Sequence, residues 1–174
     1  MAYLGRLISV AMDHTILLTS LTALFFVSVS FACPSGFTTH ENNCYVLLPV
    51  PTTWAEALRL CDAVKAKLAW IENGAENTFI VQMLKKANIT GHSTEVWLGG
   101  TDMLLEGMWM WADDMELIQY TNWFPNEPNN AGNNQHCLGM MVNQDFKWDD
   151  YSCSLTNYPL CKRMQDDGEQ SVIG

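Results

Sequence analysis

The 174-residue sequence has few basic residues: nine lysines and arginines stand against 19 aspartates and glutamates, which gives a formal net charge of −10. A nucleic-acid-binding protein needs a basic face for phosphates, so this composition argues against a nucleic-acid partner. Charged residues make up only 16% of the chain and hydrophobic ones 48%, a balance too apolar for a disordered protein. The length allows one domain of ordinary size with a substantial core.

Long apolar runs are absent except near the N-terminus. Residues 16–29 are apolar apart from four serines and threonines, and small residues at positions 30 and 32 occupy the places that a signal peptidase reads. We therefore predict a signal peptide over residues 1–32, cleaved after Ala32, and a secreted, extracellular protein with no membrane insertion after cleavage. The alternative is a membrane anchor, because residues 16–32 are close to the shortest stretch that spans a bilayer.

The sequence has no odd cysteine: it contains six, all of them after position 32. An even number in an exported chain predicts a disulfide framework. Six cysteines allow about fifteen pairings, so their number alone leaves the pairing open. They are Cys33, Cys44, Cys61, Cys137, Cys153 and Cys161.

Two helices have clear start signals. Thr53 and Glu56 have the spacing of a capping box, in which each side chain satisfies a free backbone amide, and Asn73 and Glu76 repeat that spacing. An apolar stripe at helical intervals follows each signal, and Asn88 predicts the end of the second helix. The stripes consist of Trp54, Ala57, Leu58, Cys61, Val64 and Leu68, and of Phe79, Ile80, Met83, Leu84 and Ala87.

The remainder of the chain is predicted to form short strands separated by turns. Two early helices followed by many short strands indicate an α+β fold. Residues 33–163 are predicted to form one domain, followed by a flexible acidic tail over 164–174. The strand candidates are residues 67–71, 96–99, 108–111, 138–142, 146–149 and 160–163.

A long stretch between residues 121 and 136 is rich in Asn, Pro and Gly and has no periodicity. A loop of this length inside a domain is usually functional. Glu127, Asn129 and Gln135 in this loop, and Asp149 and Asp150 after it, offer only oxygen ligands, and flexible loop spacing suits calcium better than magnesium. These five residues are therefore a candidate calcium site. The alternative is an ordinary turn-rich loop beside a solvated acidic pair.

Several motifs occur in an order that resembles one known family, the C-type lectin domain in its long six-cysteine form. The resemblance covers residues 33–163 and is strongest to small secreted invertebrate members, including the perlucin-like proteins of mollusc shell. The motifs are Cys33-Pro34-Ser35-Gly36-Phe37, Cys44-Tyr45, Trp54-Ala55-Glu56-Ala57, Trp97-Leu98-Gly99-Gly100, Glu127-Pro128-Asn129 and Trp148-Asp149-Asp150, together with the remaining cysteines.

The resemblance implies a pairing of the cysteines and a geometry for the loop. The implied disulfides are Cys33–Cys44, Cys61–Cys161 and Cys137–Cys153. The second would close a loop of about 100 residues, which contributes about 4 to 5 kcal/mol in the chain-entropy model. A cis peptide bond between Glu127 and Pro128 is also implied.

The resemblance further implies calcium-dependent glycan binding, with sugar contacts from Glu127, Asn129, Gln135 and Asp149. A carboxylate only accepts hydrogen bonds and an Asn amide can donate them, and in this family the order Glu-Pro-Asn goes with mannose, N-acetylglucosamine and fucose. Gln135 stands where a glutamate is common, and Asp149 where an asparagine is common. This reversal of donor and acceptor weakens strict mannose selectivity and predicts tolerance of galactose.

An auxiliary calcium site occurs in some members of the family. Asp102 and Glu106 match two of its ligands, whereas Asn130 and His136 stand where acidic ligands would be expected. The loss of half the carboxylates argues against occupation by calcium. His136 has no evident nucleophile near it, so we predict that the protein is not an enzyme.

Two further features have local interpretations. Most of the tryptophans are predicted to fill the core, and Trp123 is the one that remains a candidate loop contact. Asn88-Ile89-Thr90 is a glycosylation sequon, and we predict that Asn88 is modified.

The leading hypothesis is a secreted lectin of innate immunity that recognises glycans on microbial or cell surfaces. Agglutination would require a homo-oligomer, because one site per chain binds weakly. One alternative is an acidic shell or extracellular matrix protein that acts in calcium carbonate biomineralisation. Another is a lectin-like domain that binds protein and no sugar.

Overall fold

The computed structural model describes residues 33–87, 89 and 95–165. The predicted signal peptide, the alternative membrane anchor, Asn88 of the sequon and residues 166–174 of the predicted tail lie outside these residues. Within the described part of the chain, no helix has both the length and the apolarity needed to cross a membrane.

Both predicted helices are confirmed: α1 spans Trp54–Ala63 and α2 spans Gly74–Ala87. At the start of α1, the backbone amide and hydroxyl of Thr53 both donate to the Glu56 carboxylate. At the start of α2, the side-chain oxygen of Asn73 accepts from the amides of Ala75 and Glu76. The Glu76 carboxylate departs from the capping-box pattern, because it accepts from the amide of Glu72, one residue before the cap, and turns into the core.

Strands make up most of the remaining regular structure, and each predicted segment overlaps one, whereas the strands Thr38–His40 and Asn43–Leu47 fall in none of the predicted segments. The predicted strands at 67–71 and 108–111 are shortened to two residues each, the latter because Met108 belongs to a turn closed on Leu105. The last strand is longer than predicted, because Met164 pairs with Asn43, and the tail therefore begins later than position 164. The strands are β1 (Thr38–His40), β2 (Asn43–Leu47), β3 (Lys67–Leu68), β4 (Glu95–Thr101), β5 (Met110–Trp111), β6 (Cys137–Met141), β7 (Lys147–Tyr151) and β8 (Tyr158–Met164).

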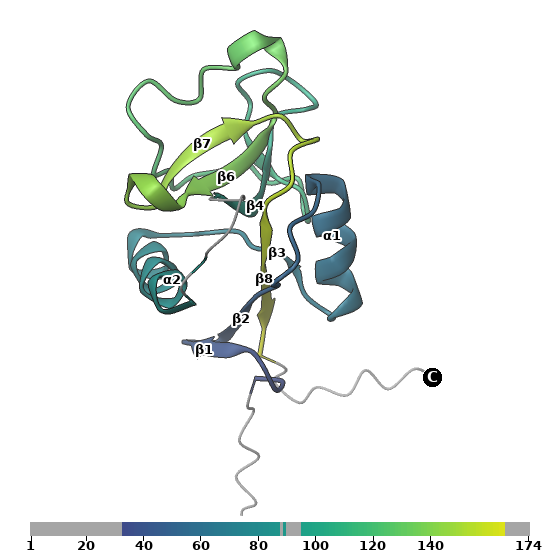
Figure 1. Cartoon of the computed structure of the whole chain (residues 1–174), viewed down its shortest axis with the longest axis vertical. Helices are drawn as coiled ribbons and strands as arrows, with labels where there is room; N and C mark the ends of the chain where they lie inside the picture. The colour runs from purple at the N-terminus through teal and green to yellow at the C-terminus, as the bar shows by residue number, and fades with distance from the viewer. Residues whose placement is uncertain (1–32, 88, 90–94, 166–174) are drawn as a thin grey trace, which may run out of the picture. The chain divides into compact units, whose positions relative to one another are not determined.

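The strands join in the order β1-β2-β8-β4-β6-β7, with β3 on β8 and β5 on β4. The β4–β8 pair is parallel and the others are antiparallel. In Figure 1 the long loop and β7 lie at the end of the described domain opposite β1. The two ends of the described chain meet beside β1, where Gln165 donates to the backbone of Asn42 and contacts Cys33. These ends are therefore remote from the long loop.

The two helices cover opposite faces of β8, and Figure 1 shows them on either side of it. Successive side chains of a strand point to opposite faces. Cys161 accordingly packs with Trp54 of α1, whereas its neighbour Leu160 packs in the cluster that holds Ile80 of α2. One strand thus supplies both halves of the core.

The tryptophans predicted to fill the core are buried, and two of them also make hydrogen bonds between segments that are distant in the sequence. The indole nitrogen of Trp54 donates to the carbonyl of Leu98, and that of Trp97 donates to the carbonyl of Thr52, both at 2.8 Å.

All three implied disulfides are present: Cys33–Cys44, Cys61–Cys161 and Cys137–Cys153. The second of them fixes α1 to β8, and the third fixes the start of β6 to the segment after β7.

Glycines in the Trp97-Leu98-Gly99-Gly100 motif allow close packing of backbone. A side chain at Gly99 would place its Cβ 2.6 Å from the carbonyl oxygen of Leu68, and one at Gly100 would lie 2.5 Å from the Leu138 side chain. The register between β4 and β6 shifts across this motif, between Trp97 and Thr101. Asp102 follows directly after β4, at the entrance to the loop-rich end.

A buried ion pair joins β8 to the start of α2. Lys162 has no exposed surface, and its ammonium lies 2.6 Å from the Glu76 carboxylate and 4.1 Å from the centre of the Trp70 ring. The same Glu76 oxygen accepts from the Tyr45 hydroxyl at 2.6 Å. The inward turn of Glu76 therefore satisfies a buried cation at the centre of the domain.

Replacement of Lys162 by Met should leave the Glu76 carboxylate buried without its cation. We expect the free energy of unfolding to fall by about 3 kcal/mol, measured by urea denaturation. Lys67→Met is the control, because Lys67 makes solvent-exposed ion pairs with Asp62 and Asp113, and its removal should cost less than about 1 kcal/mol. Equal losses in the two variants would contradict a structural role for the buried pair.

Candidate functional site

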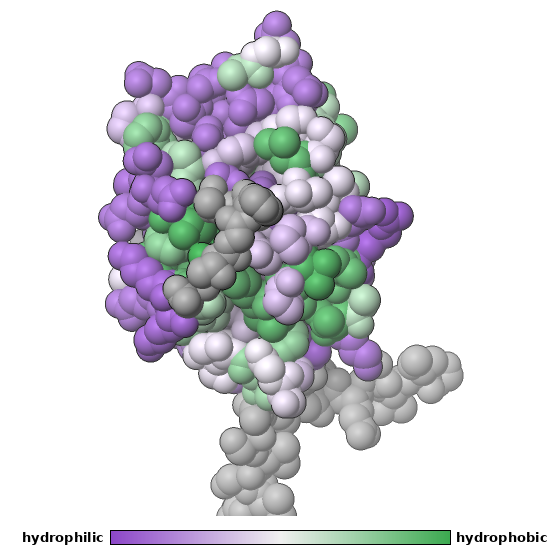
Figure 2. Space-filling model, viewed as in Figure 1, coloured by the Kyte–Doolittle hydropathy of each residue, from purple (hydrophilic) through white to green (hydrophobic). Residues whose placement is uncertain are grey.

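Three carboxylates converge where the long loop meets β7. Glu127 comes from the loop, and Asp149 and Asp150 are consecutive residues of β7. One oxygen from each lies within 4.8 Å of the others. Figure 2 shows mostly hydrophilic residues over the end of the molecule that carries this loop. The structure thus brings together the three acidic residues of the predicted calcium site.

Asp150 of β7 fixes the position of the long loop. Its carboxylate is fully buried, and its two oxygens accept hydrogen bonds from the backbone amides of Asn129 and Asn130, at 3.0 and 2.7 Å. This arrangement places Asn129 beside the acidic cluster. The peptide bond between Glu127 and Pro128, the two residues before Asn129, is cis, as the resemblance implies.

Gln135 lies against the same strand, but its amide is already engaged with backbone. Its nitrogen donates to the carbonyl of Asp150 at 2.7 Å, and its oxygen accepts from the amide of Ala131 at 2.6 Å. A carbonyl oxygen has two lone pairs, so one remains for a ligand. The sequence predicts Gln135 as a site residue but does not predict these hydrogen bonds to the backbone, because they depend on the fold of the loop around Gln135.

The electrostatics of the acidic cluster favour a cation. Burial and then the charge of Asp149 raise the pKa of Glu127 to about 7. Burial and then the charge of Asp150 raise the pKa of Asp149. One oxygen of Glu127 is buried without a hydrogen-bond partner in the described part of the chain. A divalent cation would partner this oxygen and offset the repulsion among the carboxylates, so the residues present fit calcium.

Trp123, which is half-buried, has a structural role in addition to the predicted loop contact, which stays a prediction. Its ring packs edge-on against Trp109 and Trp148, with ring centres 4.9 and 5.8 Å apart. Its backbone also forms a bridge with Trp148, the residue before the two aspartates. Trp123 therefore anchors the beginning of the loop to β7.

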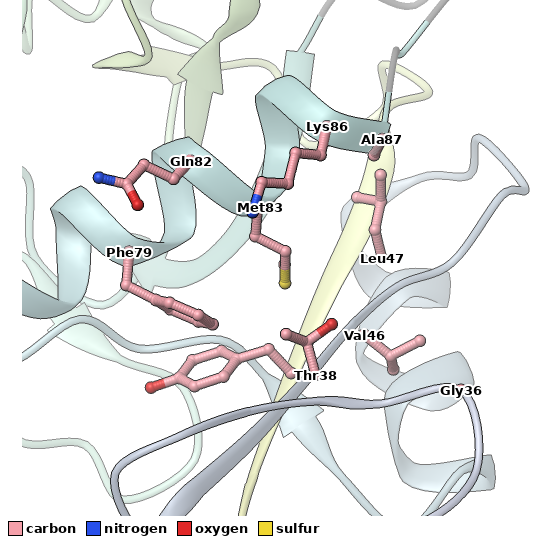
Figure 3. A pocket seen from close by; sticks show the side chains of 10 residues that line it. Gly36, Thr38, Val46, Leu47, Phe79, Gln82, Met83, Lys86 and Ala87 are labelled. Carbon is pink, nitrogen blue, oxygen red and sulfur yellow. The ribbon is translucent and has the colours of Figure 1, made fainter.

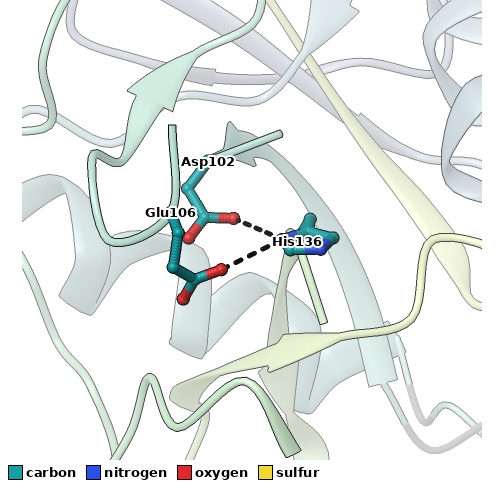
Figure 4. Close-up of side chains that lie close together, drawn as sticks. All are labelled: Asp102, Glu106 and His136. Atoms are coloured by element: carbon teal, nitrogen blue, oxygen red, sulfur yellow. Dashed lines mark hydrogen bonds and ion pairs between the residues drawn. The ribbon is translucent and has the colours of Figure 1, made fainter. Parts of the chain in front are cut away.

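The predicted auxiliary residues form a second cluster, drawn in Figure 4. Nδ1 of His136 lies 3.0 Å from Asp102 and 3.5 Å from Glu106. The side-chain amide of Asn130 donates to Glu106. All four residues of the predicted auxiliary site are therefore neighbours, although only two of them are carboxylates.

Two apolar concavities had no signal in the sequence, because each combines residues that are distant along the chain. One, of about 370 Å³, lies between the β1–β2 hairpin and α2 and is lined by Tyr45, Leu47, Phe79 and Met83 among others (Figure 3). The other, of about 620 Å³, borders Pro128. The first holds no carboxylate, so it is not a candidate for the metal site.

Comparison with known proteins identifies the family. A profile of the Lectin C-type domain matches residues 50–163. Perlucin of Haliotis laevigata is 33% identical over 132 residues, which cover 75% of this chain and 83% of perlucin. The galactose-specific lectin nattectin of Thalassophryne nattereri is 30% identical over 132 residues, which cover 76% of this chain and 80% of that protein.

A solved structure agrees with the sequence matches. The carbohydrate-recognition domain of cow CD23, crystallised in the presence of a GlcNAc2Man3 oligosaccharide, superposes with a TM-score of 0.66 at 27% identity, covering 76% of this chain and 96% of that one. The chain therefore belongs to the C-type lectin family, as its motifs predict, and it has the α+β fold of that family. It is not an enzyme, and domains of this family generally bind Ca²⁺.

Asp149→Asn should test the repulsion among the three carboxylates. In the presence of a chelator we expect the melting temperature to rise by a few degrees, because one half-buried like charge is removed at almost constant shape, and about 1 kcal/mol corresponds to a shift of roughly 2 to 8 °C. Asp145→Asn is the control, because Asp145 is exposed and has an ordinary surface ion pair with Lys85. A lower melting temperature for Asp149→Asn in chelator would show that repulsion is not the dominant effect.

Proposed function

We propose that this protein is a lectin that binds glycans through a calcium ion. The observation that carries this proposal is the convergence of Glu127, Asp149 and Asp150 around a buried, unpartnered carboxylate oxygen. Asn129 and Gln135 would complete the ligands with amide oxygens. A bound calcium ion would coordinate two neighbouring hydroxyls of a sugar ring. The protein residues then orient that ring through their hydrogen bonds.

The order of donor and acceptor along the loop supports a preference among sugars. The Glu127 carboxylate accepts from one hydroxyl, and the Asn129 amide donates to the next. The backbone of Asn129 is fixed by Asp150, so its side chain is presented from a constrained position. This order favours mannose, N-acetylglucosamine and fucose.

Gln135 and Asp149, on the other side of the proposed site, select less strongly among sugars. One N–H of the Gln135 amide is engaged with the carbonyl of Asp150, so only its second N–H remains to donate to a sugar. Asp149 only accepts, which is the reverse of the common asparagine at its position. We therefore include galactose among the ligands. The relatives named above agree with this range, since one is a galactose-specific lectin and another was crystallised with a mannose-containing oligosaccharide present.

We further propose that the protein is secreted after removal of residues 1–32 and recognises glycans on microbial or cell surfaces in innate immunity. The three disulfides are consistent with an oxidising compartment. A single site of this kind binds weakly, so agglutination would require a homo-oligomer.

Calcium should stabilise the protein through this site. We expect millimolar calcium to raise the melting temperature, and mannose to raise it further. Glu127→Gln should weaken calcium binding by at least about tenfold, which is about 1.4 kcal/mol, because it removes one carboxylate from the cluster. Glu116→Gln, at an exposed position, should behave as the wild type.

Two outcomes would count against this proposal. Sugar binding that persists in chelator would exclude the calcium mechanism. A calcium response without any sugar response on a glycan panel would favour the matrix or protein-binding alternative.

The double variant Glu127→Gln/Asn129→Asp reverses donor and acceptor across Pro128. We expect the ratio of galactose to mannose affinity to increase by about tenfold or more, measured by competition for an immobilised glycan in calcium. The control for carboxylate–amide exchange elsewhere on the surface is the Glu116→Gln/Asp114→Asn double variant on the exposed turn after β5. An unchanged ratio in a variant that still binds calcium would show that these two residues do not set the preference.

A further inference from the structure

The second cluster of metal-binding side chains is formed by three segments at the loop-rich end. Asp102 follows β4, Glu106 lies in the next turn, and His136 precedes β6. One ligand atom from each lies within 4.8 Å of the others. Figure 4 shows both carboxylates directed at the same edge of the imidazole ring. The arrangement is convergent although its members are up to 34 residues apart.

This cluster does not fit the calcium that the family would place there. Calcium takes about six to eight oxygen ligands. Here one of the three groups is a nitrogen ligand, and one oxygen of Asp102 already accepts from the amide of Gly107 at 2.8 Å. Asn130 would add at most one further oxygen, because its side-chain oxygen already accepts from the amide of Gln135 and keeps one lone pair. Calcium would therefore lack ligands.

The same three groups suit a borderline transition metal. Imidazole nitrogen and carboxylate oxygen are both ligands of Zn²⁺, which needs only about four ligands and accepts water as one of them. With a neutral imidazole the cluster carries two negative charges, and a divalent cation would balance them.

Hydrogen bonds within the protein fix the positions of two of these three residues, Asp102 and His136. Asp102 is only 1% exposed and is held by Gly107. The backbone of His136 is held on both sides, because its amide donates to Tyr151 and its carbonyl accepts from the Thr101 hydroxyl at 2.7 Å. Supporting hydrogen bonds of this kind orient the ligands of protein metal sites. Glu106, which is 56% exposed, can adjust its position to the ion.

We propose that Asp102, Glu106 and His136 form a binding site for a divalent transition metal, with Zn²⁺ as its representative, in place of an auxiliary calcium. This site is separate from the Glu127, Asp149 and Asp150 cluster, and it does not depend on sugar binding.

The test is a titration of the disulfide-bonded protein with zinc chloride in saturating calcium, followed by calorimetry. We expect one zinc ion per chain with a dissociation constant in the micromolar range or lower. His136→Gln and Glu106→Gln should each weaken binding by at least about tenfold. His40→Gln is the matched control, because His40 stacks on Phe79 in a different part of the domain and should leave zinc binding unchanged.

Cobalt provides a readout that does not depend on stability. Co²⁺ in a four-coordinate site with a nitrogen ligand should give visible absorption that zinc displaces and that His136→Gln removes. Absence of stoichiometric zinc binding would overturn the proposal. So would binding that survives His136→Gln, or a second calcium ion that Glu106→Gln removes, since this would identify an ordinary auxiliary calcium site.

Discussion

Asp150 is a fully buried carboxylate whose two oxygens accept hydrogen bonds from successive amides of the long loop. This contact brings the loop onto β7 and keeps Glu127 close to two aspartates, an arrangement that their mutual repulsion opposes. Holding one buried and two half-buried carboxylates together is unfavourable without a counter-charge. The proposed calcium ion and the proposed glycan site therefore both depend on how firmly Asp150 holds the loop.

The rest of the domain supports β7 in this position. The Cys137–Cys153 disulfide fixes the ends of the β6–β7 pair, and Trp148, just before the aspartates, packs among Trp111, Tyr120 and Trp123. Close approach at the glycines of β4 lets β4 and β6 pair through a register shift. The site is thus built on rigid strands although most of its proposed ligands are polar loop residues.

Local patterns in the sequence were sufficient for the helix starts, for six of the eight strands among the described residues and for the acidic residues of the site, but not for β1 and β2. The disulfides and the cis bond came from family resemblance. Contacts between distant segments were not predictable in this way: Glu76 leaves its expected cap for buried Lys162, and Trp123 packs inward. Gln135 was identified, but its engagement with backbone depends on the folded loop. In each case a long-range partner determines the orientation of a side chain that local spacing leaves open.

The attachment of the loop to β7 leaves one short segment that supports the loop mainly through its backbone and the Asn134 side chain. Asn130 and Gln135 are tied to Asp150, whereas the four residues between them are exposed, and a side chain added at Gly132 would meet only open space. Changes at these four positions that respect the backbone angles can therefore alter the rim of the binding face without displacing the proposed ligands. Selection could diversify contacts with sugar residues beyond the first ring while the metal-binding centre stays constant.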